Sequence, residues 1–353
     1  MFKVFNVKCS CEISCKISII FMQLPNCCIV ESVIIMIIDN LIFSLNATMP
    51  LFFVMVVGWL LKNRKIISDE FVSVSNKLNF NVTLVCLLFL DMKDSGIKEN
   101  FNIKYVIFCF VVTFICISLT WIGARLLLKD KSVIAEFVQG SYRGSAAVLG
   151  IALISNVAGD TGMAPIMIVG AVPLYNIFAV IILAVESSDN KSKSLADLCK
   201  KAVRGVCTNP IILSIFAGMI FSLFDWDLPH VVNKTMTSIA SLTSPLALIC
   251  IGASFKGKAT IKMLGPTAAA TLIKLVIQPL IFLPIAAKLG FGVAEMAAVL
   301  IMLGAPTTPT CYVMAKNTGH DGSLTASIVA LTTVLSAFTV TLWVFVMRMF
   351  GWI

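Results

Sequence analysis

The sequence predicts an all-α polytopic membrane protein whose ten transmembrane helices form two inverted five-helix repeats. Three observations lead to this fold class: a strongly apolar composition, apolar runs of membrane-spanning length, and an internal offset of 160 residues between the two halves. Of the 353 residues, 59% are hydrophobic and 13% are charged. Soluble proteins carry about 25% charged residues, so this chain has too few to cover a globular surface in water.

The apolar runs are about twenty residues long, which is the length a helix needs to cross a roughly 30 Å hydrocarbon layer. We therefore expect ten transmembrane helices. In chain order they lie near residues 39–61, 71–92, 104–128, 133–157, 163–185, 206–224, 236–254, 263–287, 294–316 and 324–350.

The first 35 residues fit this pattern poorly. The stretch "ISIIFMQLPNCCIVESVIIMII" contains Pro25 and Glu31, and it has no small-residue cleavage site for a signal peptide. We expect Met36 to be the natural start and residues 1–35 to be an extension outside the repeat. The alternative is an eleventh helix that lies on the membrane or crosses it.

The lysines and arginines of the loops predict the orientation. Loops after odd-numbered helices carry 15 of them, whereas loops after even-numbered helices and the C-terminus carry 6. Because positive loops stay in the cytoplasm, both ends of a chain that starts at Met36 should face outward from the cell membrane. The net charge of +9 lies in these loops, so it does not indicate a nucleic-acid partner.

An internal repeat divides the chain at its longest polar segment, the cytoplasmic loop 191–205. At an offset of 160, Pro50 and Gly58 correspond to Pro210 and Gly218. The same offset relates Gly159 and Gly162 of "AGDTG" to the two glycines of "TGHDG". Five helices per half is an odd number, so the second repeat (206–353) should be inverted relative to the first (36–190). Inverted repeats of this kind are typical of secondary transporters.

Two helices are interrupted at matching positions. The ninth contains "GAPTTPT" (304–310), and the fourth contains "GSYRGSAAVLG" (140–150). Such a break survives at membrane depth only where it lines a cavity or is buried in protein. Two matching breaks indicate a midplane substrate site, and the unpaired N–H groups of half-helix ends favour an anion.

Arg143 strengthens the prediction of an anion site, because a charge in mid-span is costly and is usually functional. Its guanidinium can hold a carboxylate through two parallel hydrogen bonds. It could equally tie down carbonyls that the break leaves free, and the sequence does not decide between these roles. For Lys274, which precedes Gln278 and Pro279, a structural role is favoured.

We expect the substrate to be bound by residues around the two breaks and in "PLYN" (173–176), although Pro173 can also simply kink a helix for packing. The candidate binding residues are Tyr142, Arg143, Gly144, Ser145, Tyr175, Asn176, Pro306, Thr307, Thr308 and Thr310. Asp160, His320 and Asp321 are candidates for proton coupling. Twelve cysteines and two histidines show no metal-ligand spacing, so no metal, cofactor or catalytic residue is expected.

Several motifs resemble the auxin efflux carrier family, which includes bacterial malate and malonate permeases. They are "GSYRGSAAVLG", "AVPLYNIFAV", "NPIILSIFAGM", "SPLALICIGASF", "APTTPTCYVMAK" and "LTTVLSAFTV", and the resemblance covers about residues 39–350. It implies a ten-helix fold similar to bile-acid sodium symporters, with broken fourth and ninth helices that cross near the midplane. It also implies organic-anion transport by an elevator-like movement of one domain against a scaffold.

The chain departs from the family pattern at three positions. Family members commonly have asparagine where this chain has Ser145 and near Thr310, and those amides are expected to meet the substrate carboxylate. The second helix usually carries a proline where this chain has Val85, whereas the corresponding Pro245 is kept. The identity of the substrate is therefore left open.

The sequence thus favours a secondary transporter of organic anions such as malate, malonate or auxin-like acids. A receptor or sensor without transport is the first alternative. An intramembrane serine hydrolase is the second, with Ser145 as nucleophile, but its base would have to be His230 or His320 at predicted helix ends. A proton or sodium ion and a second copy of the chain are further candidate partners, besides the lipid bilayer.

Overall fold

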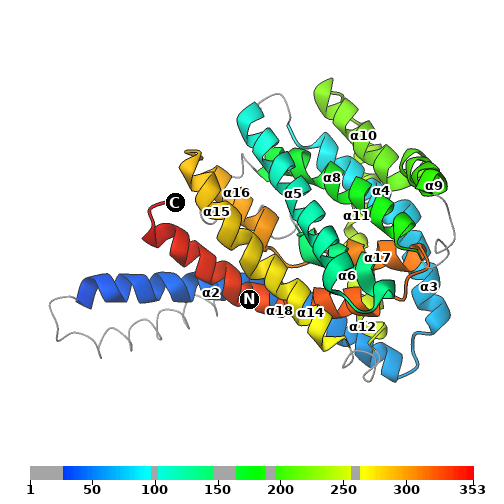
Figure 1. Cartoon of the computed structure of the whole chain (residues 1–353), viewed down its shortest axis with the longest axis horizontal. Coiled ribbons are helices and arrows are strands. Elements are labelled where there is room, and N and C mark those ends of the chain that lie inside the picture. The colour runs from blue at the N-terminus through cyan, green and yellow to red at the C-terminus, as the bar shows by residue number, and fades with distance from the viewer. Residues whose placement is uncertain (1–26, 97–101, 146–163, 188–194, 256–262) are drawn as a thin grey trace.

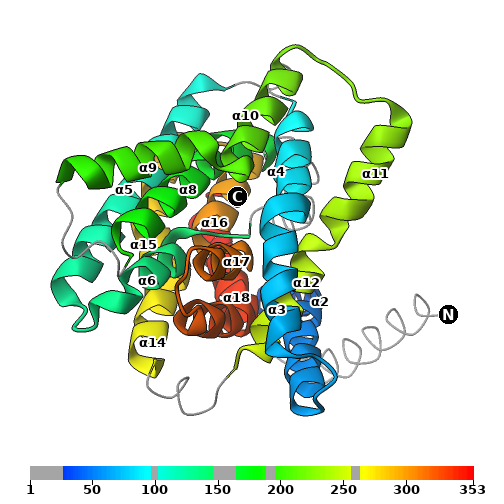
Figure 2. The same cartoon turned by 90° about the vertical axis from the view of Figure 1, so that its right-hand side faces the viewer.

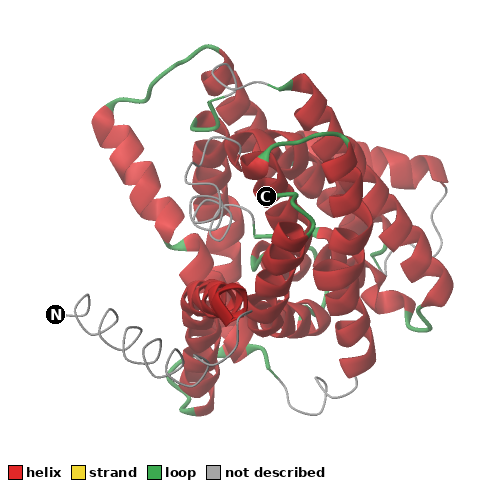
Figure 3. Cartoon of the chain, turned by 90° about the vertical axis from the view of Figure 1, so that its left-hand side faces the viewer, coloured by secondary structure: helices red, strands yellow, loops and turns green. Residues whose placement is uncertain are grey.

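The computed structural model describes residues 27–96, 102–145, 164–187, 195–255 and 263–353. Within these ranges the regular elements are helices, which Figure 3 colours red, with the described loops and turns in green. Seven of the described helices are long and apolar enough to cross a membrane, or eight if one bent pair counts as a single span. The protein is therefore a multi-pass membrane protein.

The first half of the chain contains five helices or groups of consecutive helices, coloured from blue to green in Figure 1. They are α2 (Cys27–Asn63); α3 (Asp69–Leu78), the π-turn η1 (Asn79–Thr83) and α4 (Leu84–Lys93); α5 (Ile103–Leu127); the short turn η2 (Lys131–Val133) with α6 (Ile134–Tyr142); and α8 (Ala164–Val185). The helix α2 begins twelve residues before the expected span 39–61 and runs past Met36 without interruption.

The second half follows the same pattern. It contains α9 (Leu195–Thr208) and α10 (Pro210–Leu223); α11 (His230–Ser241) and α12 (Thr243–Ala253); α14 (Leu264–Leu272), the π-turn η5 (Ile273–Ile277) and α15 (Gln278–Lys288); α16 (Val293–Gly304) and α17 (Thr310–Asn317); and α18 (Ser323–Met349). The predicted count of ten spans stays a prediction. Three predicted spans lie outside the seven: the fourth reaches undescribed residues, the sixth is the bent pair, and the ninth is two short helices.

One local prediction was wrong. Residues 191–205 were expected to form a loop, but α9 occupies Leu195–Thr208 and packs against α8. The segment alternates apolar and charged residues at helical spacing, so one of its faces can pack while the other stays exposed. It ends before Asn209, whose side chain caps α10 by accepting a hydrogen bond from the Ile211 N–H at 2.9 Å. Pro210 then occupies the first turn of α10, as predicted.

The glycines of the sequence repeat make equivalent contacts. A Cβ on Gly58 of α2 would lie 2.3 Å from the carbonyl oxygen of Ile249 in α12, and one on Gly218 of α10 would lie 2.4 Å from that of Phe89 in α4. Gly58 and Gly218 are separated by the offset of 160, and so are Phe89 and Ile249. Only glycine permits such close backbone approach. Two helix pairs related by the repeat therefore pack in the same way.

The interrupted ninth helix lies inside the bundle, where Figure 2 shows α16 and α17 among the surrounding helices. Every residue of α16 from Met296 to Gly304 is buried, so this helix is apolar on all sides and touches protein rather than solvent. In the break at 305–309, residues 305–307 are buried, and Thr308 and Pro309 are partly buried. Burial in protein is the condition for tolerating such a break at membrane depth.

Candidate substrate site at the crossing of two broken helices

The two interrupted segments meet and run antiparallel. The helix α6 ends at Tyr142 and α16 ends at Gly304, and the residues that follow each end pair with each other. The Ser145 N–H donates to the Pro306 carbonyl at 2.9 Å, and the Thr308 N–H donates to the Arg143 carbonyl at 3.4 Å. Gly144 and Thr307 lie opposite each other between these two bonds. Each break thus supplies hydrogen-bond partners to the other.

The carbonyls at the end of α6 find partners outside the helix. A helix end leaves its last four carbonyls without intrahelical bonds, and burial makes unpaired ones costly. Here side chains from other helices and from the second break bind three of them. The bonds run from Thr307 Oγ1 to Gly140 (2.6 Å), from Gln278 Nε2 to Ser141 (2.9 Å) and from Lys274 Nζ to Tyr142 (3.2 Å).

Lys274 connects the C-terminal ends of α6 and α16. Its side chain is fully buried, and besides Tyr142 of α6 its ammonium donates to the Met302 carbonyl of α16 at 2.9 Å. A cation near helix C-termini is also favoured by the helix dipole. The structural role predicted for Lys274 agrees with these contacts.

Arg143 makes different contacts. Its side chain bonds Asn176 Oδ1 (3.0 Å), Gln139 Oε1 (3.4 Å) and Met314 Sδ (2.9 Å), and no backbone carbonyl. The residue is only 3% exposed, and its Nε has no partner. No described carboxylate pairs with the guanidinium. Arg143 is therefore a buried cation with an unused donor and without a described counter-ion.

A small cavity of about 70 Å³ lies beside Arg143. Seven of the ten predicted binding residues line it, namely Arg143, Gly144, Ser145, Tyr175, Asn176, Thr308 and Thr310. The other three, Tyr142, Pro306 and Thr307, do not line it. Tyr142 instead donates its hydroxyl to the Tyr175 carbonyl at 3.0 Å, and the Thr307 N–H donates to Thr332 Oγ1 at 3.1 Å. These contacts hold the crossing together.

The structure adds residues to the cavity that the sequence did not suggest. They are Leu87, Leu88 and Asp91 of α4, Ile168 and Val172 of α8, and Ser244 of α12. The sequence alone could have suggested a role for Asp91, because an acidic residue near the end of the apolar run "LVCLLFLD" is energetically costly unless it has a function. The contribution of Ser244 had no such signal.

The N-terminus of α17 also faces this cavity. Thr308 Oγ1 accepts a hydrogen bond from the Thr310 N–H at 3.4 Å, and the two hydroxyls lie 3.2 Å apart. Because Pro309 has no N–H, these threonines provide the polar groups at this end of the helix. A helix N-terminus carries partial positive charge, which adds to the positive potential from Arg143.

A second, larger cavity of about 550 Å³ lies at the other end of α17. Its lining includes Lys62 of α2, Asn76 of α3, Ser254 after α12, and Lys316 and Asn317 at the C-terminal end of α17. Between the cavities, Tyr312 of α17 shares a hydrogen bond with Ser254 of α12, and Asn317 Nδ2 donates to the Asn76 carbonyl of α3 at 2.9 Å. The eight-residue helix α17 therefore separates two cavities.

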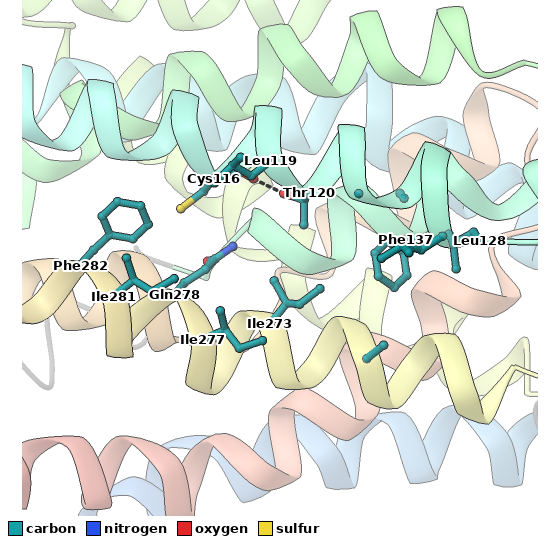
Figure 4. Close-up of a pocket in the computed structure, with 14 residues that line it drawn as sticks. Cys116, Leu119, Thr120, Leu128, Phe137, Ile273, Ile277, Gln278, Ile281 and Phe282 are labelled. Carbon is teal, nitrogen blue, oxygen red and sulfur yellow. Dashed lines mark hydrogen bonds between the residues drawn. The ribbon is translucent and has the colours of Figure 1, made fainter.

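A third cavity, of about 310 Å³, is an apolar groove between α5 and α14–α15, drawn in Figure 4. Cys116, Leu119 and Thr120 face Ile273, Ile277 and Ile281 across it. No charged side chain lines this groove, so it lacks the groups that would hold an anion, and the cavity beside Arg143 is the better candidate site.

Comparison with known proteins identifies the family. The family model described as "Membrane transport protein" matches residues 43–344. This chain belongs to that family. The match confirms the resemblance to the auxin efflux carriers and places the protein among membrane transporters rather than enzymes.

The transporter is distantly similar to curated proteins along most of its length. It is 20% identical to the "Putative malonate transporter" of Rhizobium meliloti over 296 residues, which is 83% of this chain and 92% of the relative. It is 19% identical to an uncharacterized transporter of Methanothermobacter thermautotrophicus, over 85% of this chain and 97% of the relative. An uncharacterized transporter of Methanocaldococcus jannaschii is 22% identical, over 84% of this chain and 94% of the relative.

The positions where the transporter departs from the family pattern lie close to the site. Ser145 and Thr310 both line the cavity, so hydroxyls stand where longer amides are common. Near Val85, the second helix is interrupted by the π-turn η1 instead of a proline, and Asn79 of this turn donates to the Thr243 carbonyl of α12 at 3.0 Å. The turn and the break between α11 and α12 lie 160 residues apart, and the turn packs against both of these helices.

The remaining candidates lie away from the cavity. His320 Nε2 is 3.3 Å from the Leu183 carbonyl, and Asp321 lines the second cavity. Asp160 lies outside the described residues. Neither His230 nor His320 lines the cavity that contains Ser145, so Ser145 has no histidine base there. Among the described residues, no cluster of histidine, cysteine or acidic side chains could hold a metal ion.

Proposed function

We propose that this transporter carries small organic anions across the cell membrane, with carboxylates such as malonate or malate, or auxin-like acids, as substrates. One observation carries the proposal: Arg143 is buried beside a cavity, keeps an unpaired Nε, and has no described counter-ion. A buried charge without a partner is costly, and a bound carboxylate would supply that partner through bidentate hydrogen bonds.

The contacts of Lys274 and Gln278 support this role against the structural alternative. These two side chains and Thr307 already bind the carbonyls that the break in α6 leaves free. The side chain of Arg143 is therefore not needed for that purpose. The name of the Rhizobium meliloti relative supports a dicarboxylate such as malonate as the first substrate to test.

The proposed mechanism is alternating access of the elevator type, in which the crossing moves against a scaffold. Two features support it: cavities lie at both ends of α17, and the pairs α2–α12 and α4–α10 pack through repeat-related glycines. The proposed division has repeats at 36–190 and 206–353, with both ends outside for a chain that starts at Met36. A homodimer formed through the scaffold helices is part of the proposal.

Uptake by proteoliposomes tests the function. Vesicles that contain the purified protein should accumulate labelled malonate faster than empty vesicles, and unlabelled malate should compete. Binding of malonate without any uptake would instead support a receptor. If no small mono- or dicarboxylate is bound or taken up, the organic-anion proposal is wrong.

A further inference from the structure

We infer that Asp91 couples anion binding to the uptake of one proton, because it lines the same small cavity as Arg143. The inference rests on the proposed function and specifies its coupling ion. Sequence patterns pointed to other residues for proton coupling, namely Asp160, His320 and Asp321, and not to Asp91.

The position of Asp91 is the first step. It lies half-buried in the last turn of α4, and with Arg143, Ser145 and Thr308 it lines the cavity of about 70 Å³. No described residue forms a hydrogen bond or ion pair with its carboxylate, and it is not paired with Arg143. The carboxylate is therefore available to the cavity and to a ligand within it.

The other charged groups near α4 are engaged elsewhere. Lys93 pairs with Asp94 at 2.9 Å and with Asp227 at 3.5 Å, and Asp94 is exposed. The helices α8 and α10 and the π-turn η1, which pack against α4, carry no charged residue within their bounds. On α11, His230 and Lys234 are exposed. Among the described residues, Arg143 and Asp91 are thus the charged side chains that line this cavity.

The small size of the cavity determines how a bound anion affects Asp91. A ligand carboxylate bound to Arg143 in so small a space must lie close to Asp91. Two carboxylates that share a site disfavour each other's ionised forms, so one of them takes up a proton. Arg143 favours the ionised ligand, so the proton goes to Asp91, which has no such partner.

The charges balance in both states. In the empty site the Arg143 cation and the Asp91 anion compensate each other at a distance. In the loaded site the cation faces one ligand carboxylate while Asp91 is neutral, so each bound ligand enters with one proton from water. A second carboxylate, such as that of malonate, keeps its own charge. When the anion leaves the site, Asp91 loses this proton again, so the occupancy of the site and the protonation of Asp91 change together.

Calorimetric titration of the full-length protein in detergent with malonate tests the inference. Above pH 7 malonate is a dianion, so any proton taken up on binding comes to the protein. Titrations in two buffers with different heats of ionisation should show proton uptake by the natural protein. Its Kd should rise with pH, up to about tenfold per pH unit, the limit for one linked proton.

Substitution of Asp91 should remove this linkage. Asp91→Asn should bind malonate at least as tightly as the natural protein at high pH, with a flat pH profile and no proton uptake. Asp91→Ser serves as a second variant, with folding checked by thermal unfolding. Asp94→Asn is the matched control: it removes an acid three residues away that is exposed and paired with Lys93, so the linkage should persist.

The outcomes separate the two proposals. If Asp91→Asn and Asp91→Ser bind malonate with unchanged proton uptake and pH slope, the role of Asp91 is wrong while the anion site stands. A requirement for sodium at constant pH, lost in Asp91→Asn, would also overturn the proton coupling. If the natural protein and Asp94→Asn bind no carboxylate at any pH, the proposed function fails, and the inference fails with it.

Discussion

Two buried cations at the crossing, Arg143 and Lys274, illustrate how contacts separate roles that residue type does not. Both lie in mid-span and both are almost completely buried. Lys274 uses its ammonium on one carbonyl from each broken helix, whereas Arg143 bonds only side chains and keeps an unpaired donor. A cation whose donors are used by the backbone stabilises the fold, and one that faces a cavity can bind a ligand.

Substitution of Arg143 by lysine is the first test at this scale. Arg143→Lys keeps the charge but removes the planar fork, so malonate binding should weaken by about 1.5–3 kcal/mol, the range for hydrogen bonds to charged groups. Titration calorimetry measures the change, and thermal unfolding should show little loss of stability. Normal malonate affinity combined with lost stability would mean that Arg143 is a structural clamp.

Thr307 provides the opposite test, because it bonds the crossing but does not line the cavity. Thr307→Val keeps the shape and removes the donor to the Gly140 carbonyl, leaving a buried acceptor unpaired. We expect a loss of stability of about 1–3 kcal/mol with malonate affinity retained. Thr235→Val is the control, since its hydroxyl is exposed and bonds only within α11. A large loss of malonate affinity in Thr307→Val would instead show that Thr307 takes part in substrate binding.

At the scale of elements, the repeat is expressed as contacts between helices. The pairs α2–α12 and α4–α10 approach closely at Gly58 and Gly218, where the partner is backbone and cannot move aside. The helix α17 is held between two cavities by bonds to α12 and α3. These bonds connect the crossing with its surroundings, so a movement of the crossing would have to break them.

Alanine at the two glycines tests the equivalence of these contacts. Gly58→Ala and Gly218→Ala should each destabilise the protein by about 1–3 kcal/mol, the range for overpacking, and by similar amounts. Thermal unfolding in detergent compares them with Gly123→Ala, where no atom lies within 4 Å of the added Cβ. This control should be neutral or slightly stabilising, because alanine favours the helix. Unequal losses at Gly58 and Gly218 would contradict the equivalence.

For the whole molecule, the proposal places the lysine-rich loops in the cytoplasm and the crossing at the midplane. The two cavities then lie on opposite sides of the crossing, with the one beside Arg143 toward the outside. In this orientation Asp91, in the last turn of α4, exchanges its proton through the outer cavity.

Single cysteines test the orientation. In a background without accessible cysteines, a cysteine at residue 192 or 257 should be shielded from impermeant thiol reagents in intact cells, because both positions lie in lysine-rich stretches between predicted spans. Permeabilised cells provide the control, in which both positions should react. Labelling of both positions in intact cells would show that the protein has the opposite orientation in the membrane.

The sequence by itself determined the class of the protein and the place of the site. A chain with 59% hydrophobic residues has to be in a membrane, and breaks at membrane depth have to be buried. Because these two constraints act on local sequence, the amino-acid sequence alone was enough to bring together Arg143, Ser145 and Thr308, which line one cavity. That they bind a substrate stays a prediction. The helical form of residues 195–208 was also encoded locally and was missed because its charged face suggested a loop.

Only the tertiary structure decided what each of these residues does. The carbonyls of α6 are bound by side chains more than 130 positions away in the sequence, and Gln278 and Ser141 are separated by 137 positions. Tyr142, Pro306 and Thr307 do not line the cavity, whereas Asp91 of another helix does. Hydrogen bonding and burial depend on which distant segments pack together, and local sequence does not record that packing.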